Sequence, residues 1–134
     1  MAKKILIVDD DRDLVESLSQ VLRVRGYEVA AAYRGADGLR AVLAERPDLV
    51  ILDVMMETDT AGFEVADQIR NPRPGSRYAE VRDLPLVILT AIGQVTNSRF
   101  SLDPADNFLP GVEAFLTKPV DVDELLAVIA RLLP

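Results

Sequence analysis

Cysteine and histidine are absent from this chain of 134 residues, and aromatic residues make up only 5% of it. The absence of cysteine excludes a disulfide framework and any thiolate metal site. The absence of histidine excludes a catalytic imidazole and argues against a zinc site. Because aromatic side chains are so few, the hydrophobic core must be aliphatic.

Long hydrophobic runs and dense clusters of basic residues are also missing. The first apolar run, Ile5 to Val8, is too short for a signal-peptide core, and no stretch is long enough to span a bilayer. The formal net charge is −7, whereas a nucleic-acid-binding domain normally carries a basic face. We therefore expect a cytoplasmic protein that binds no membrane and, by itself, no nucleic acid.

Hydrophobic residues nevertheless make up 49% of the chain, which is enough for a real core. The length suits one compact domain over residues 1–134. Short apolar runs alternate with segments of helical period, which predicts an α/β fold with a parallel sheet between two layers of helices. The expected strands are 4–8, 27–32, 49–52, 86–89 and 112–116, and the expected helices are 11–25, 36–45, 63–70 and 121–133.

Two segments interrupt this alternation. Residues 71–85 form a long connection that contains three prolines. Residues 91–111 should hold a fourth helix, but Pro104 and Pro110 would interrupt helical hydrogen bonding, and the apolar residues there lack a regular period. We expect this region to depart from a regular helix, since connections of such length are usually functional or mobile.

Polar side chains stand where four of the expected strands end. Asp9, Asp10 and Asp11 follow the first strand, Asp53 the third, Thr90 the fourth and Lys118 the fifth. In an open parallel sheet these strand ends converge on one edge, where ligands bind.

Carboxylate oxygens are ligands that magnesium prefers, and a carboxylate can also accept a phosphoryl group. Lys118 suits the point charge beside a phosphoryl oxygen, and Thr90 a hydroxyl that donates to another. Each residue alone has an ordinary alternative: a helix cap, which we favour for Asp11, a strand end or a surface lysine. Their occurrence together, in this order, favours one shared site.

The chain resembles the receiver domain of two-component response regulators, which has the chemotaxis-regulator type of fold. The resemblance covers essentially the whole chain. It rests on five motifs in order, which are Ile5-Leu6-Ile7-Val8-Asp9-Asp10-Asp11, Leu52-Asp53-Val54-Met55-Met56, Gly62-Phe63-Glu64, Ile88-Leu89-Thr90-Ala91 and Phe115-Leu116-Thr117-Lys118-Pro119.

The resemblance implies a doubly wound, flavodoxin-like three-layer sandwich with a five-stranded sheet of order 2-1-3-4-5. It implies that Asp53 accepts a phosphoryl group from a sensor histidine kinase or a phosphotransfer protein, in a magnesium-dependent reaction. Asp10 and Asp53 would bind Mg²⁺ directly, Asp9 through water and Met55 through its backbone carbonyl. Mn²⁺ would be a substitute for Mg²⁺.

The same resemblance assigns the phosphoryl oxygens to Thr90, Ala91 and Lys118. Thr90 and Phe115 would form the switch that alters the partner-binding surface after phosphorylation. Ala91 matches the small residue that leaves the acceptor accessible, and the peptide bond from Lys118 to Pro119 is expected to be cis. The downstream target would be another protein.

The chain departs from the family pattern after Asp53. The family normally has proline four residues on and glycine eight on, whereas this chain has Glu57 and Ala61, with Gly62 one position later. The loop is therefore expected to carry an insertion.

Two apolar residues flank the expected approach path of water to the phosphoryl group. In the family, polar residues at the positions of Met55 and Ile92 tend to speed self-dephosphorylation. Because neither side chain here can orient water, we expect a long-lived phosphorylated state.

Three functions fit these features. The first is a phosphorylation-driven signalling module, which catalyses only its own phosphorylation and dephosphorylation. The second is a pseudo-receiver that binds a partner without taking phosphate, although such domains usually lose the acceptor, the acidic pair or the lysine. The third is a small magnesium-dependent phosphatase, which would usually need a second acid or base and a lid domain; the nearest downstream acid is Glu57.

Overall fold

A five-stranded parallel sheet forms the centre of the molecule, with strand order β2-β1-β3-β4-β5. The computed structural model describes residues 2–58, 60–91 and 112–134. The strands are β1 (Lys4–Val8), β2 (Glu28–Ala32), β3 (Leu49–Asp53), β4 (Leu86–Ala91) and β5 (Ala114–Lys118). Every pairing is parallel, so the predicted sheet and strand order are confirmed.

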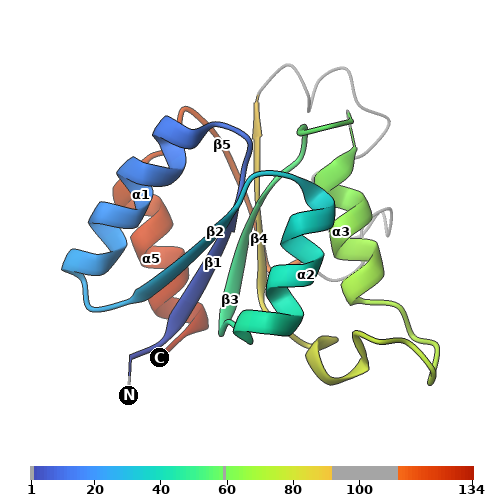
Figure 1. Ribbon diagram of the computed structural model, residues 1–134. Coiled ribbons are helices and arrows are strands. Elements are labelled where there is room, and N and C mark those ends of the chain that lie inside the picture. The colour runs from blue at the N-terminus through green and yellow to red at the C-terminus, as the bar shows by residue number, and fades with distance from the viewer. Residues whose placement is uncertain (1, 59, 92–111) are drawn as a thin grey trace.

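Helices cover both faces of the sheet, as predicted (Figure 1). One face carries α1 (Arg12–Val24) and α5 (Val122–Leu132), and the other carries α2 (Gly35–Glu45) and α3 (Ala61–Ile69). The long connection before β4 contains one short 3₁₀ turn, η1 (Ala79–Val81). Within the described ranges, no helix is both long and apolar enough to cross a membrane.

Two aliphatic clusters fill the space between the layers. Successive residues of a strand point to opposite faces, so Ile5 and Ile7 of β1 pack under α1 and α5, whereas Leu6 and Val8 pack under α2 and α3. Each of these four side chains is fully buried. Burying one such side chain is worth about 1.5–3 kcal/mol, so the central strands form a rigid platform.

The turn between β1 and α1 is short because α1 begins at once after the acidic cluster. Asp11 is the N-cap, and its side chain accepts a hydrogen bond from Leu14 N at 3.1 Å, which confirms the predicted cap. Gly26 follows the helix with a φ of 91°, a conformation that glycine adopts without steric cost. Asp9 and Asp10 are therefore held at the top of β1.

The fourth and fifth strands extend further than the sequence predicted. β5 spans Ala114–Lys118 rather than 112–116, and β4 continues to Ala91. Their backbones pair Thr90 with Thr117 and Ala91 with Lys118. Backbone hydrogen bonds between the two strands therefore extend both strands past their apolar residues to include polar ones. Thr90 and Lys118 thus lie on strands rather than after them.

Smaller differences occur at helix ends. Helix α3 begins at Ala61, two residues before the predicted start. Val122, the first residue of α5, is 36% exposed. The predicted irregularity of 91–111 concerns residues that, beyond Ala91, lie outside the described part of the chain.

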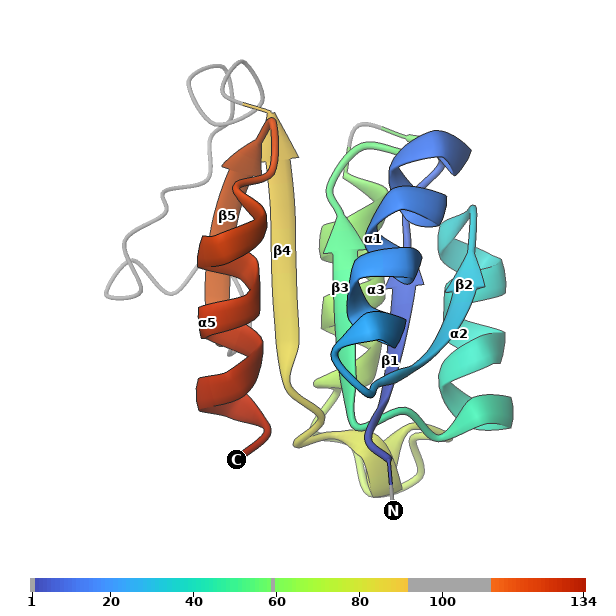
Figure 2. The ribbon, with the colours of Figure 1, turned by 90° about the vertical axis from the view of Figure 1, so that its left-hand side faces the viewer.

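All strands point toward one edge of the sheet, and both termini lie near the opposite edge (Figure 2). The carboxyl ends of β1, β3, β4 and β5 therefore meet, as the parallel topology requires.

Candidate functional site

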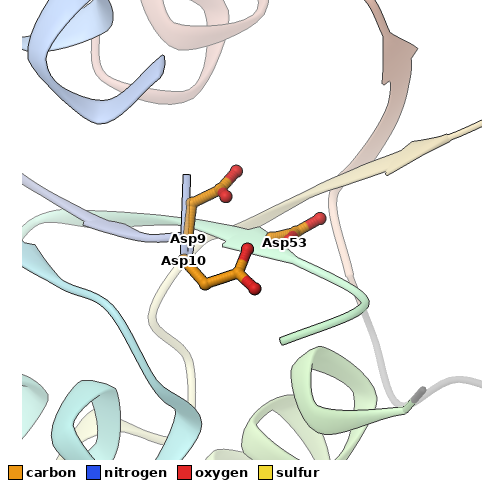
Figure 3. Close-up of side chains that lie close together, drawn as sticks. All are labelled: Asp9, Asp10 and Asp53. Atoms are coloured by element: carbon orange, nitrogen blue, oxygen red, sulfur yellow. The ribbon is translucent and has the colours of Figure 1, made fainter. Parts of the chain in front are cut away.

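Three carboxylates meet at the carboxyl edge of the sheet. Asp9, Asp10 and Asp53 each offer an oxygen, and these oxygens lie within 4.8 Å of one another (Figure 3). The register explains why, because Val8 of β1 pairs with Leu52 of β3 and the acids follow directly on both strands. The predicted meeting of these three side chains is thus found.

Two of the three acids are buried. Asp9 is 0% exposed and Asp53 is 3% exposed, whereas Asp10 is exposed. Asp9 Oδ1 accepts a hydrogen bond from Asp11 N at 2.9 Å. In the described part of the chain, Asp9 Oδ2 receives no hydrogen bond of good geometry, although Lys118 Nζ lies 3.0 Å away. This buried carboxylate oxygen therefore has unused capacity to accept a hydrogen bond or to bind a cation.

Lys118 lies between the two buried acids. Its Nζ is 3.0 Å from Asp9 Oδ2 and 3.1 Å from Asp53 Oδ1. Burial would lower the pKa of Lys118, but its contacts with Asp9 and Asp53 outweigh that effect and raise it. The lysine is therefore a fixed positive charge, and one ammonium serves two carboxylates.

The surroundings of Asp53 make its ionised form less favourable than that of a free carboxyl group. Burial, followed by repulsion from Asp9, raises the pKa of Asp53 to about 6, although Lys118 acts in the opposite direction. A further cation beside the carboxylates would relieve this repulsion. The positive charge of Lys118 alone does not balance the cluster.

The donor set fits Mg²⁺, a hard cation that prefers carboxylate and carbonyl oxygens and keeps several waters. Asp9, Asp10 and Asp53 supply the carboxylates, and the incompletely bonded Asp9 Oδ2 is an observation that such a cation would explain. Met55 lies in the loop after β3, with its side chain 40% exposed.

The remaining predicted residues occupy the neighbouring strands. Thr90 is 3% exposed at the end of β4, and Ala91 is paired in register with Lys118. Phe115 of β5 is partly buried against the cluster on the α2–α3 face. The peptide bond between Lys118 and Pro119 is cis, as expected.

The loop between β3 and α3 is fixed close to Asp53. Gly62 N donates to Val54 O at 2.8 Å, and a Cβ on Gly62 would lie 2.1 Å from the carbonyl oxygen of Asp53. Only glycine permits this close approach, so Gly62 lets the start of α3 pack directly against the end of β3.

Glu57 makes a contact that the sequence did not predict. Both of its carboxylate oxygens lie 2.9 Å from Gly35 N, at the start of α2. Although partial burial acts the other way, hydrogen bonds from backbone amides, Gly35 first, lower the pKa of Glu57. The only signal in the sequence was an acid where the family pattern has proline.

An apolar groove of about 410 Å³ opens beside the site. It lies between α1 and the segment that joins β5 to α5. Its lining residues are Asp11, Leu14, Ser17, Leu18, Val21, Lys118, Pro119, Val120 and Val122. The groove thus shares Lys118 with the acidic cluster.

Known proteins with similar sequences are response regulators. The response regulator MprA of Mycobacterium ulcerans is 39% identical over 134 residues, which cover 99% of this chain and 51% of that protein. The DNA-binding dual master transcriptional regulator RpaA of Synechocystis is 35% identical over 130 residues, or 97% of this chain and 48% of that protein. The chain spans about half the length of these relatives.

Solved structures with the same architecture include response regulators. A putative response regulator from Chloroflexus aurantiacus has a TM-score of 0.77 and 30% identity, covering 98% of each chain. The chemotaxis response regulator CheY4 of Vibrio cholerae has a TM-score of 0.75 and 26% identity, covering 99% of this chain and 100% of that one.

The family match agrees with these comparisons and with the geometry of the acidic edge. The family described as the response regulator receiver domain matches residues 5–130. This family acts as the phosphoacceptor module of two-component signalling. The chain therefore belongs to the response regulator receiver domain family.

Proposed function

We propose that Asp53 is the residue that accepts the phosphoryl group, in a reaction that depends on Mg²⁺ held by Asp9, Asp10, Asp53 and the carbonyl of Met55. The observation that supports this most strongly is the position of Asp53. It is a buried carboxylate with an ammonium at 3.1 Å and two further carboxylates beside it. A buried carboxylate in a purely structural role needs a cationic partner, but the two further carboxylates beside Asp53 add repulsion that such a role does not require.

The donor in this proposal is the phosphohistidine of a sensor kinase or of a phosphotransfer protein. The bond between phosphorus and the imidazole nitrogen breaks, and a bond between phosphorus and an oxygen of Asp53 forms. Bound Mg²⁺ would supply charge neutralisation at the phosphoryl oxygens and the carboxylates. Transfer of this kind depends on placement and electrostatics more than on covalent help from the protein.

The chain's own residues place and neutralise the reacting groups. Lys118 pairs with one phosphoryl oxygen, the Thr90 hydroxyl donates to another and the Ala91 amide donates to a third. Asp53 must be ionised to attack, and its raised pKa of about 6 still leaves it mostly ionised near pH 7. Lys118 then exchanges its contact with Asp53 for one with the phosphoryl group.

In this proposal, phosphorylation changes the conformation of the surface that binds a partner. After phosphorylation, Thr90 moves toward the phosphoryl group and Phe115 turns inward into the space it leaves. The altered surface then binds a downstream protein or passes phosphate on. The cytoplasmic location, the single domain over 1–134 and the absence of other catalytic activity remain predictions.

Labelling with a small phosphodonor tests the proposal. Wild-type protein incubated with acetyl phosphate and Mg²⁺ should carry an acyl phosphate on the peptide that contains Asp53. Asp53→Asn should lose the label, and Lys118→Ala should be labelled about tenfold or more slowly. Asp67→Asn, which changes an exposed acid on α3, is the matched control and should be labelled like wild type.

Two results would contradict the proposal. Label of wild-type strength on Asp53→Asn would place the acceptor elsewhere. Labelling of the wild type that is equally fast in the presence of a chelator would remove the metal from the reaction. A protein that folds but takes no label would instead be a pseudo-receiver, and turnover of added phosphomonoesters would indicate a phosphatase.

A further inference from the structure

We propose that Glu57 is a positioning residue for the metal site, because its carboxylate caps α2 from the β3–α3 loop and thereby fixes the segment that carries the Met55 carbonyl. This inference rests on the proposed function, in which that carbonyl is a ligand of Mg²⁺. The contact joins two segments that are 22 residues apart in the chain.

The start of α2 needs an acceptor from outside the helix. The first backbone amides of a helix have no partner within it, and the N-terminal end of the helix dipole favours negative charge. Arg34 occupies the N-cap position of α2 but makes no side-chain capping bond. Glu57 supplies the acceptor instead, since both carboxylate oxygens lie 2.9 Å from Gly35 N.

Gly35 shapes the space that receives the carboxylate. A Cβ at this position would lie 3.3 Å from Glu57 Oε2 and 3.3 Å from Val65 Cγ2. These distances are tighter than ordinary van der Waals contact, so the carboxylate fits against the helix because residue 35 has no side chain. The position of the carboxylate thus depends on both segments.

The residues on each side of Met55 are held independently. On one side, Val54 N donates to Leu89 O at 3.1 Å, and Val54 O accepts from Gly62 N at 2.8 Å. On the other side, the Met56 side chain packs against the cluster on the α2–α3 face, and Glu57 is bonded to α2. The direction of the Met55 carbonyl is therefore set from both ends.

Because Glu57 holds the β3–α3 loop in place before the ion binds, its removal should weaken the affinity for Mg²⁺. If Glu57 is removed, binding of Mg²⁺ must also order the freed part of the loop, and ordering backbone costs free energy. We expect Glu57→Ala to raise the dissociation constant for Mg²⁺ about five- to tenfold. Glu57→Gln keeps an oxygen that can accept from Gly35 N, so we expect only about a twofold increase.

The test combines calorimetric titration of Mg²⁺ with the NMR signal of the Gly35 amide. Wild type, Glu57→Ala, Glu57→Gln and Gly35→Ala are compared with Glu16→Ala, which removes the same charge from an exposed position on α1. The amide proton of Gly35 should move upfield in Glu57→Ala even without metal. Glu16→Ala should leave both the signal and the affinity as in wild type.

A double-mutant cycle separates positioning from simple attraction between charges. Glu57→Ala and Gly35→Ala should be less than additive in their effects on the affinity, because Glu57→Ala removes the contact that the added Cβ of Gly35→Ala would displace. Equal losses in Glu57→Gln and Glu57→Ala would overturn the proposal in favour of a charge effect. Unchanged affinity in Glu57→Ala, with a wild type that binds Mg²⁺, would also overturn it. A wild type that binds no Mg²⁺ would contradict the metal site of the proposed function, whereas the metal-free Gly35 signal would still report the cap.

Discussion

The two ends of the sheet hold charged groups in opposite ways. At the amino ends of β4 and β5, Arg70 donates to Arg82 O at 2.5 Å and to both oxygens of Glu113 at 3.1 and 3.2 Å. Glu113 Oε2 also accepts from Leu86 N at 2.7 Å. At the carboxyl ends, the buried Asp9 and Asp53 share the single ammonium of Lys118.

The difference distinguishes a structural network from a binding site. The Arg70 network matches one cation with one anion and adds backbone partners, so it fastens the end of α3 and the connection before β4 to the sheet. At the acidic edge, burial and then repulsion from Asp9 raise the pKa of Asp53 to about 6, although Lys118 acts in the opposite direction. Unbalanced buried charge is costly unless a ligand completes the site.

Breaking the balanced network should have the largest effect on stability. Arg70→Ala removes the partner of a partly buried carboxylate and of the Arg82 carbonyl. We expect a loss of about 2–3 kcal/mol in the free energy of unfolding, measured with urea. Arg23→Ala, which removes an exposed arginine from the last turn of α1, should change stability by less than about 0.5 kcal/mol. Equal losses in both variants would show that the network contributes little.

Removing a charge from the acidic edge should increase stability, whereas breaking the Arg70 network should decrease it. Without divalent cations at pH 7, Asp53→Asn should be more stable than wild type by about 1–2 kcal/mol. A pKa that rises from 3.8 to about 6 corresponds to at most about 3 kcal/mol at about 1.4 kcal/mol per unit, and the loss of a partner for Lys118 reduces the gain. Destabilisation by Asp53→Asn under these conditions would argue that the edge is already balanced.

The same substitution should change the pH dependence of stability. Because the folded state holds the proton of Asp53 more tightly than the unfolded state, its contribution falls as the pH rises from 3.8 to about 6. The gain from Asp53→Asn should therefore be absent below that window and complete above it. Glu57 has a lowered pKa, so its contribution to stability is instead lost as the pH falls. Because Glu57 is present in both wild type and Asp53→Asn, the difference in stability between these two proteins reports on Asp53 alone. A gain that is constant across the window would contradict the assignment.

The smallest effect concerns a side chain beside the acidic edge. Met55→Asn, alone or with Ile92→Glu, should shorten the lifetime of the aspartyl phosphate about tenfold, since a polar group there can orient the attacking water. Ile92 lies outside the described residues, whereas Met55 is exposed in the loop after β3. Decay is followed by loss of the acyl phosphate. Val24→Asn, at an exposed position at the end of α1, should decay like wild type, and unchanged decay in Met55→Asn would exclude this position from control of hydrolysis.

Most of the site could be predicted from sequence because parallel strands bring their carboxyl ends together whatever their side chains. Asp9 and Asp53 could therefore be placed at the same edge of the sheet from two apolar runs, and the strand order implied by the resemblance makes their strands neighbours. The limits of β5 could not be placed, since the pairing of Thr117 and Lys118 with β4 depends on backbone hydrogen bonds rather than on hydrophobic pattern.

The contact of Glu57 could not be predicted for a different reason. It joins a loop to the start of a helix 22 residues earlier, and its geometry depends on the absence of a side chain at Gly35. Local sequence shows an acid in an irregular loop and no more. Long-range polar contacts of this kind require the packed arrangement of α2 and the sheet.

We infer that the charge of the acidic edge is unbalanced until a cation binds, and the dependence of stability on Mg²⁺ tests this inference most directly. The free energy of unfolding of wild type and of Asp53→Asn is measured by urea titration at pH 7 over a range of Mg²⁺ concentrations. Wild type should gain stability as Mg²⁺ rises, and the advantage of Asp53→Asn should shrink and then reverse. Equal gains in the two proteins, or no gain in wild type, would contradict the claim.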